Sequence, residues 1–329
     1  MDLKILAICD VEALYAKRLM EVFCEKKTHG FQIHVFSNVA ELAIFAHKNE
    51  LEILLIAGSL MSEEIQRMNI GKIILLTDGE VYEDFSDYEN IYKYQSAEKI
   101  LKEILYCYAE YARPTTGNYF WKKEFEIHGV YSPIGRCGKS VLARTLAEKM
   151  GQEKRTLLLD LQSYSAYLEQ LGDEEFWDLA DMIYFLRQGK KTFLYKLGSI
   201  VQNRGTYDYI FPMKTPADIR SVTLAEWMEL LDKFAAESDY QVLVLDFGND
   251  IQGLFDLLGR CDHVYTPVLS DEDSKRKMRN FEMILKDENS EKVLRCMEKI
   301  NLPTGGLQVN WKLFLEEWAE RKSRHESAK

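Results

Sequence analysis

The sequence predicts an α/β protein made of two domains, each a doubly wound parallel sheet. The chain has 329 residues, more than a single hydrophobic core usually serves, and 47% of them are hydrophobic. Short apolar segments alternate with helical patterns along most of its length. Some of these segments, such as 242–245, are apolar without interruption, as strands buried on both faces of a parallel sheet are.

The first domain is expected over residues 1–112. Five short segments rich in β-forming residues are separated there by segments with helical periodicity, which favours a parallel sheet covered by helices. Residues 113–118 follow with turn-forming residues and no periodicity, which is typical of a linker. Strands are predicted at 4–9, 32–36, 53–57, 72–77 and 91–94, and helices at 11–27, 38–49, near 61–69 and at 96–112.

The second domain is expected over residues 119–329. It begins with an alternating strand, continues through a short loop, and enters a helix that ends at Gly151. Further buried strands and two long helical stretches follow. The strands are predicted at 125–131, 155–160, 208–211, 240–246 and 263–266, and the helical stretches near 173–204 and 217–238.

The loop between that first strand and helix carries the strongest chemical signal. It ends in Gly138-Lys139-Ser140, which matches the end of the phosphate-binding pattern G-x-x-x-x-G-K-S/T, although Pro133 stands at the leading glycine. Backbone amides and a helix N-terminus attract phosphate there, and a lysine reaches the outer phosphates. The alternative is a simple turn. The expected nucleotide-binding residues are Ile134, Gly135, Arg136, Cys137, Gly138, Lys139, Ser140 and Val141.

Two acidic residues at strand ends complete this predicted site. Asp246 follows four apolar residues and would hold Mg²⁺ together with the Ser140 hydroxyl. Asp160 ends the strand after the loop helix, where it would sense the γ-phosphate or orient a water, and with Lys139 it forms the expected catalytic pair. An aspartate that caps a strand end is the alternative for Asp246. The predicted cofactors are ATP and Mg²⁺.

Composition narrows the class of protein. The net charge of −11 opposes nonspecific DNA binding, which depends on release of counterions by basic residues. Six cysteines form no closely spaced pair, which argues against a zinc site and a disulfide framework. Cys137 is expected to be a tolerated small residue rather than an oxidation sensor. No apolar run approaches the roughly 20 residues that span a bilayer, so a cytoplasmic protein is expected.

The first domain resembles the receiver domains of two-component signalling, which have a flavodoxin-like fold. Thr77 ends the fourth strand, and Asp10 matches one member of the usual acidic pair. The position of the phosphoacceptor aspartate is occupied by Ala57-Gly58. Phosphotransfer needs that carboxylate, so the resemblance implies an atypical receiver that is used for binding.

The second domain resembles the MinD/ParA superfamily of P-loop NTPases over most of residues 125–285. That superfamily has a D-x-D segment where this chain reads Asp160-Leu161-Gln162. It also has a signature lysine that crosses an ATP-bridged dimer, at the position of Ile134, and a second glycine at the position of Arg136. An aliphatic side chain cannot replace a cation and an amide cannot act as a base, so slow hydrolysis is expected. Arg136 either supplies the cation or points to solvent.

An atypical receiver followed by such an ATPase resembles the TadZ/CpaE-like proteins. This resemblance implies an ATP-binding spatial regulator that recruits or positions pilus or secretion assembly proteins. It also implies a homodimer located in the cytoplasm, at a cell pole or at the inner face of the membrane, with no specific nucleic acid. The alternatives are a nucleotide-bound scaffold that does not hydrolyse ATP, a ParA-type DNA-partition ATPase and, last, a small-molecule kinase.

The C-terminal region carries an apolar stripe at helical spacing: Trp311, Leu315 and Trp318. Such a helix docks on a core or lies on a membrane surface, and the intervening glutamates favour docking on the core. Peripheral membrane contact is the less favoured alternative. Asn310 and the segment 301–303 are candidates for recognition of the nucleotide base.

Overall fold

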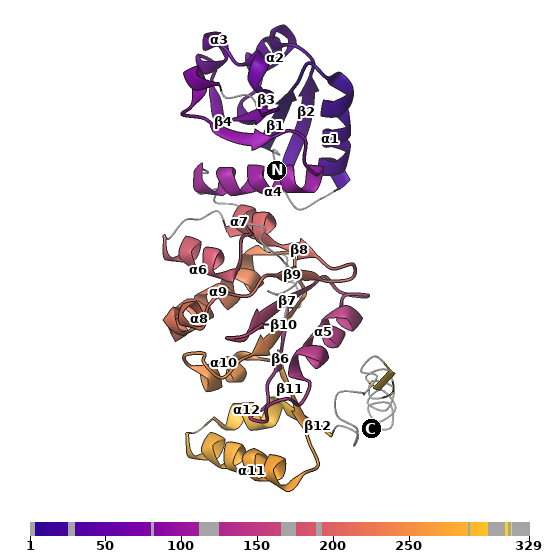
Figure 1. Cartoon of the computed structure of the whole chain (residues 1–329), viewed down its shortest axis with the longest axis vertical. Helices are drawn as coiled ribbons and strands as arrows, with labels where there is room; N and C mark the ends of the chain where they lie inside the picture. The colour runs from indigo at the N-terminus through magenta and orange to yellow at the C-terminus, as the bar shows by residue number, and fades with distance from the viewer. Residues whose placement is uncertain are drawn as a thin grey trace. The chain divides into compact units, whose positions relative to one another are not determined.

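The computed structural model divides the chain into two compact units (Figure 1). The first unit comprises residues 1–116 and 190–199, and the second comprises residues 117–189 and 200–329. The residues that the structure describes are 4–25, 30–79, 82–111, 125–165, 176–188, 193–288, 290–301, 313–314 and 317.

The first unit contains a five-stranded sheet in the order β2-β1-β3-β4-β5. Every neighbouring pair in it is parallel, which is the flavodoxin-like arrangement. The order reverses between β1 and β3, and polar residues that follow strands near such a switch point share one sheet edge. The strands are β1 (Lys4–Cys9), β2 (Phe31–Phe36), β3 (Leu51–Ala57), β4 (Ile70–Thr77) and β5 (Glu89–Tyr92).

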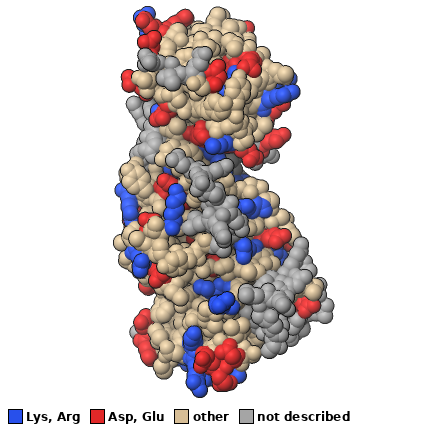
Figure 2. Space-filling model, viewed as in Figure 1, with Lys and Arg blue, Asp and Glu red and all other residues tan. Residues whose placement is uncertain are grey.

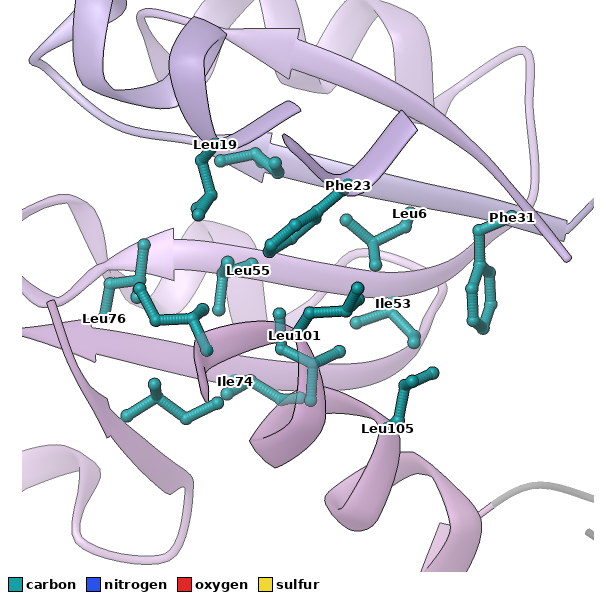
Figure 3. Packing of buried hydrophobic residues seen from close by; sticks show 14 of the residues in the cluster. Leu6, Leu19, Phe23, Phe31, Ile53, Leu55, Ile74, Leu76, Leu101 and Leu105 are labelled. Carbon is teal, nitrogen blue, oxygen red and sulfur yellow. The ribbon is translucent and has the colours of Figure 1, made fainter. Parts of the chain in front are cut away.

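Helices cover both faces of this sheet. Leu6 and Ile8 of β1 belong to one buried cluster, which Figure 3 shows with Phe23, while Ala7 and Cys9 belong to the cluster on the opposite face. Side chains alternate along a strand, so β1 is buried on both sides. The helices are α1 (Ala13–Glu25), α2 (Val39–Ala46), α3 (Glu63–Gln66), α4 (Ala97–Tyr111) and the 3₁₀ turns η1 (Gly58–Leu60) and η2 (Glu83–Phe85).

A helix from the middle of the chain also packs in the first unit. Helix α7 (Phe193–Ile200) carries Tyr195, whose ring centroid lies 4.7 Å from that of Tyr108 and 5.6 Å from that of Phe31. Lys196 is buried with its Nζ 3.4 Å from the centroid of the Tyr106 ring. Aromatic packing and a cation–π contact therefore hold this segment on the core of the first unit.

The second unit contains a seven-stranded sheet in the order β12-β11-β6-β10-β7-β9-β8. All neighbouring strands are parallel except β8 and β9, which are antiparallel. The strands are β6 (Glu126–Val130), β7 (Thr156–Leu161), β8 (Gln202–Asn203), β9 (Asp208–Ile210), β10 (Val242–Phe247), β11 (His263–Val268) and β12 (Met297–Asn301).

The helices of this unit start at clear sequence signals. Thr215 and Thr223 form capping boxes with Asp218 and Glu226. In each box the threonine hydroxyl oxygen accepts a hydrogen bond from the backbone amide of the acidic residue, and the carboxylate accepts one from the backbone amide of the threonine. Gly138 precedes the helix of the loop as its N-cap and has a left-handed conformation. The helices are α5 (Lys139–Met150), α6 (Leu179–Arg187), α8 (Pro216–Ser221), α9 (Leu224–Glu237), α10 (Leu254–Arg260), α11 (Glu272–Asp287) and α12 (Glu291–Cys296).

The predicted α/β class with two doubly wound sheets is confirmed. The single helical stretch predicted near 173–204 was wrong in detail, because it contains α6, α7 and the two-residue edge strand β8. The predicted linker and the stripe of Trp311, Leu315 and Trp318 lie outside the described residues. Among the residues that are described, no helix is both long and apolar enough to cross a membrane.

Candidate functional site

The loop between β6 and α5 is anchored at its start by Ser132. The Ser132 hydroxyl donates a hydrogen bond to the Pro267 carbonyl (2.9 Å) and accepts one from the Ile134 amide (3.2 Å). Pro267 lies on β11, the strand next to β6. The loop therefore leaves the sheet in a direction fixed by a buried side chain, although Pro133 replaces the usual leading glycine.

Two residues of the loop have positive φ angles. Gly138 has φ 75° and Arg136 has φ 57°, and Arg136 is the only non-glycine residue with this conformation in the described part of the chain. Left-handed backbone is easy for glycine and costs roughly 1–2 kcal/mol for other residues. The loop thus keeps a glycine-type backbone at the position where the MinD/ParA superfamily has its second glycine. The Arg136 side chain is exposed, as is Gly135.

Ile134 and Cys137 face the interior. Their exposed fractions are 3% and 2%, and the Cys137 thiol donates to the Ile134 carbonyl at 3.0 Å. Burial raises the pKa of Cys137, so its thiol is protonated and poorly reactive at neutral pH. The side chain of Ile134 is packed in the unit's own core, so only the backbone of these two residues is available to a ligand. Val141, one turn into α5, is partly buried against the core.

Lys139 begins α5 and reaches across to the neighbouring strand end. Its Nζ donates to the Phe247 carbonyl at 2.7 Å and lies 5.5 Å from the centroid of the Tyr131 ring. Phe247 is the last residue of β10. The ammonium therefore lies beside the end of β10 and at the N-terminus of α5, and the ammonium and the helix N-terminus both favour an anion nearby.

Asp160 and Asp246 are paired in register on adjacent strands β7 and β10. Both are buried, with exposed fractions of 3% and 2%. Burial raises the pKa of Asp246, and burial together with the charge of Asp246 raises that of Asp160. Two acids this close and this dry compete for charge, and a cation between or beside them relieves the competition.

Gln162 lies between the two residues that are expected to hold the metal. Its Nε2 donates to Ser140 Oγ at 2.5 Å and to Asp246 Oδ2 at 2.6 Å. Asp246 Oδ1 is buried and has no hydrogen-bond partner among the described residues. Such an oxygen, beside a serine hydroxyl, fits a hard divalent cation such as Mg²⁺. Ser140 and Asp246 would hold that ion, which would supply charge neutralisation at the outer phosphates.

Three further residues shape the site and were not among the predicted site residues. The Ser165 hydroxyl donates to Asp160 Oδ2 at 2.5 Å. Gly248 follows β10, where an added Cβ would lie 2.7 Å from the Leu161 carbonyl oxygen. The third is Phe247, through its carbonyl. Gly248 was detectable, because a glycine directly after a strand-end acid often marks a close backbone approach. The contacts of Ser165 with Asp160 and of Lys139 with the Phe247 carbonyl arise from the folded structure, so no local sequence signal could have predicted them.

The corresponding sheet edge of the first unit has a different arrangement. Asp10 follows β1 and is fully buried, and Lys93, which follows β5, lies 2.7 Å from Asp10 Oδ2 and 2.8 Å from Glu12 Oε1. Burial alone would lower the pKa of Lys93, but hydrogen bonds to both carboxylates outweigh it and raise this pKa. At the end of β3, a Cβ on Gly58 would lie 2.3 Å from the Tyr82 ring. A side chain therefore has no room at Gly58 in this arrangement.

Comparisons with known proteins find similar chains among solved structures. No protein-family model and no curated protein sequence match the chain. A ParA family ATPase from Chlorobium tepidum matches 59% of this chain and 98% of its own, with 19% identity and a TM-score of 0.45. A putative plasmid partition protein from Borrelia burgdorferi, bound to AMPPNP, matches 60% and 100%, with 15% identity and a TM-score of 0.43.

A third structural neighbour is named as a synthase. It is the cobyrinic acid a,c-diamide synthase from Mycobacterium smegmatis with bound ADP and magnesium, which matches 60% of this chain and 82% of its own, with 14% identity and a TM-score of 0.42. At such identities and TM-scores, the function has to be inferred from the site itself.

Proposed function

We propose that the second unit binds ATP with Mg²⁺ and that the protein is a nucleotide-dependent spatial regulator with slow hydrolysis. The observation that carries this proposal is the meeting of Lys139 and Ser140, at the N-terminus of α5, with the buried carboxylate of Asp246 at the end of β10. A left-handed Gly138 and the helix N-terminus supply amides for phosphate, and Lys139 supplies the cation. The predicted candidates for recognition of the base, Asn310 and the segment 301–303, lie outside the described residues apart from Asn301.

Slow turnover is proposed from two side chains. Gln162 stands where the D-x-D pattern has its second aspartate, and an amide cannot act as a base. Ile134 stands where the superfamily has its signature lysine, and its buried aliphatic side chain cannot reach a partner's phosphates. Asp160 is left to sense the γ-phosphate or to orient a water. A protein with this site holds a nucleotide state for long periods, which suits a positional marker better than a rapid enzyme.

The first unit is proposed to be a binding module rather than a phosphorylated switch. Tyr82 covers Gly58, at the strand end where a phosphoacceptor would stand, and Lys93 is already neutralised by Asp10 and Glu12. Together with the resemblance to TadZ/CpaE-like proteins, this supports recruitment or positioning of pilus or secretion assembly proteins by a homodimer. Co-purification of such a partner with the full chain, lost on removal of nucleotide, is the expected result.

Calorimetry with ATP and Mg²⁺ tests the nucleotide site. Lys139→Ala is expected to weaken binding about tenfold to a hundredfold, because hydrogen bonds to charged groups contribute roughly 1.5–3 kcal/mol. Lys149→Ala, near the other end of α5, is the matched control and is expected to bind normally. Equal affinity of Lys139→Ala and the unaltered protein would refute the assignment.

A scaffold that never hydrolyses ATP is the second candidate, favoured by Gln162 and Ile134. In a single-turnover assay, ATP that is still intact after hours would support the scaffold, and measurable ADP would support the slow ATPase. DNA partition is less favoured, because the net charge is −11 and Figure 2 shows acidic side chains among the basic ones on the visible face. Salt-sensitive DNA binding would be required to revive it.

A further inference from the structure

We propose that the Gln162 carboxamide takes the place of the divalent cation in the nucleotide-free protein and must leave it when a Mg²⁺–nucleotide complex binds. Gln162 thereby determines how strongly nucleotide binding depends on the metal. This inference rests on the proposed function, since it concerns the same site. It assigns a role to a side chain that departs from the D-x-D pattern of the superfamily.

The contacts of the amide nitrogen carry the inference. A single nitrogen, Nε2, lies 2.5 Å from Ser140 Oγ and 2.6 Å from Asp246 Oδ2, the two groups that would hold Mg²⁺. An ionised carboxylate only accepts hydrogen bonds, so the NH₂ end of the carboxamide, not its oxygen, must face Asp246. The two amide hydrogens serve both oxygens at once. A cation that binds both oxygens has to displace the carboxamide and break both hydrogen bonds.

The backbone that carries Gln162 is held in position. Its amide donates to Asp160 Oδ1 at 3.0 Å, and the Gly248 amide donates to the Leu161 carbonyl at 3.1 Å. A Cβ on Gly248 would lie 3.1 Å from the Gln162 Cα, so the two strand ends approach closely because Gly248 has no side chain. Only the side-chain torsions of Gln162 need be ordered for the amide to reach its partners, which keeps the entropic cost small.

Charge explains why an amide suits this position. Asp160 and Asp246 are both buried, and a third carboxylate beside them would be repelled whenever the metal is absent. An amide instead donates to Asp246 and leaves the local charge unchanged. The nucleotide-free state is stabilised by the same two hydrogen bonds that oppose the metal.

Calorimetry of ATP binding in Mg²⁺ and in EDTA measures this competition. Gln162→Ala removes the amide, and Gln162→Asn keeps the amide but shortens the side chain by one methylene so that it cannot reach both oxygens. Both variants are expected to bind Mg²⁺–ATP about threefold to tenfold more tightly, the worth of one or two hydrogen bonds, with unchanged affinity in EDTA. Gln188→Ala, at an exposed position after α6, is the matched control and is expected to change neither.

A second readout needs no nucleotide. Titration with Mg²⁺ alone is expected to raise the thermal midpoint of Gln162→Ala at lower metal concentrations than that of the unaltered protein. This titration also shows whether each variant is folded.

The outcomes separate the inference from the proposed function. Weaker Mg²⁺–ATP binding by both variants would make Gln162 a metal or water ligand and overturn the inference, and an unchanged ratio of Mg²⁺ to EDTA affinities would overturn it as well. Absence of ATP binding by the unaltered protein under both conditions would instead refute the proposed function.

Discussion

The two units place acidic residues at the carboxyl edge of similar parallel sheets but neutralise them in different ways. In the first unit, Asp10 is paired directly with Lys93, a cation supplied by the chain itself. In the second, Asp246 is contacted by an uncharged amide and keeps a buried oxygen without a partner among the described residues. The first edge therefore contains its own cation, and the second is the edge at which we propose that Mg²⁺ binds.

The difference gives a physical criterion for the metal-binding edge proposed above, within two sheets of the same fold class. Position at a strand end is shared by both sets of acids, so position alone does not separate them. The balance of charge and hydrogen bonding does: Lys93 forms an ion pair with Asp10, whereas the Gln162 amide donates to Asp246 and Lys139 donates to the Phe247 carbonyl instead. Substitutions that disturb this balance should therefore have opposite consequences in the two units.

The largest effect is expected when the internal cation of the first unit is removed. Lys93→Met leaves Asp10 buried and unpaired, so the free energy of unfolding should fall by about 3–5 kcal/mol in urea denaturation. The double variant Lys93→Met/Asp10→Asn should recover part of that loss. Lys99→Met, at an exposed position on α4, is the control. A loss no larger than that of the control would mean that the pair contributes nothing.

The same substitution at the two edges should then change stability in opposite directions. Asp10→Asn weakens a charged hydrogen bond to Lys93 and should cost about 2 kcal/mol. Asp246→Asn removes a buried carboxylate whose pKa is raised by burial, so the metal-free protein should become more stable. Asp246→Asn should also weaken Mg²⁺–ATP binding. Urea denaturation in EDTA measures the change in the free energy of unfolding for both variants. A change in the same direction in both would contradict the proposed difference between the two edges.

Acidification should stabilise the metal-free second unit through Asp160. Its pKa is raised to about 7 by burial and by the charge of Asp246. A raised pKa in the folded state means that the stabilising contribution is complete well below the unfolded value near 4 and is lost as the pH rises through about 7. Unfolding free energy in EDTA should therefore increase from pH 8 toward pH 5, by at most about 1.4 kcal/mol per pH unit.

The variant Asp160→Asn tests this assignment, because it should flatten that part of the pH profile. Asp178 and His128 are further groups to exclude, since burial raises the pKa of Asp178 to about 6 and lowers that of His128, which opposes the effect of Asp160 as the pH falls. Asp178→Asn should flatten only the lower part of the profile. An unchanged slope in Asp160→Asn would assign the pH dependence elsewhere.

Periodicity was sufficient to predict most strands of both sheets and the strand–loop–helix order around Gly138. Asp160 and Asp246 were each assigned to the site from their positions at strand ends, and the structure pairs them in register on adjacent strands. Pairings between distant residues were not predictable. Lys93 and Asp10 are 83 positions apart in the sequence, and the local sequence around one does not indicate that it pairs with the other.

Local signals were also too weak for some elements. Strand β8 has two residues, too few for alternation to be visible, and α7 was expected with the second domain because its position in the chain says nothing about its aromatic partners. Gln162 was identified as a departure from the acidic pattern. Its contact with Ser140 depends on the close approach at Gly248, which is a property of the folded sheet.

The smallest expected effect concerns the backbone of the loop itself. After β4 in the first unit, a positive φ of 107° is adopted by a glycine, Gly79, at little cost. In the loop of the second unit, a positive φ of 57° is adopted by Arg136, for which it is strained. Arg136→Gly removes the left-handed strain of roughly 1–2 kcal/mol but gives the unfolded chain more freedom, so a net gain of about 0.5–1 kcal/mol is expected.

Arg136→Ala separates the backbone from the charge. Alanine keeps a Cβ and hence the strain, so its stability should match that of the unaltered protein, while both variants lose the guanidinium. Because the Arg136 side chain is exposed in the structure, ATP affinity should be similar in both variants and in the unaltered protein at low protein concentration. A parallel loss of ATP affinity in both, with stability gained only by the glycine variant, would instead assign Arg136 the role of the missing superfamily lysine and would show that strain is retained at this loop for the sake of a phosphate-binding cation.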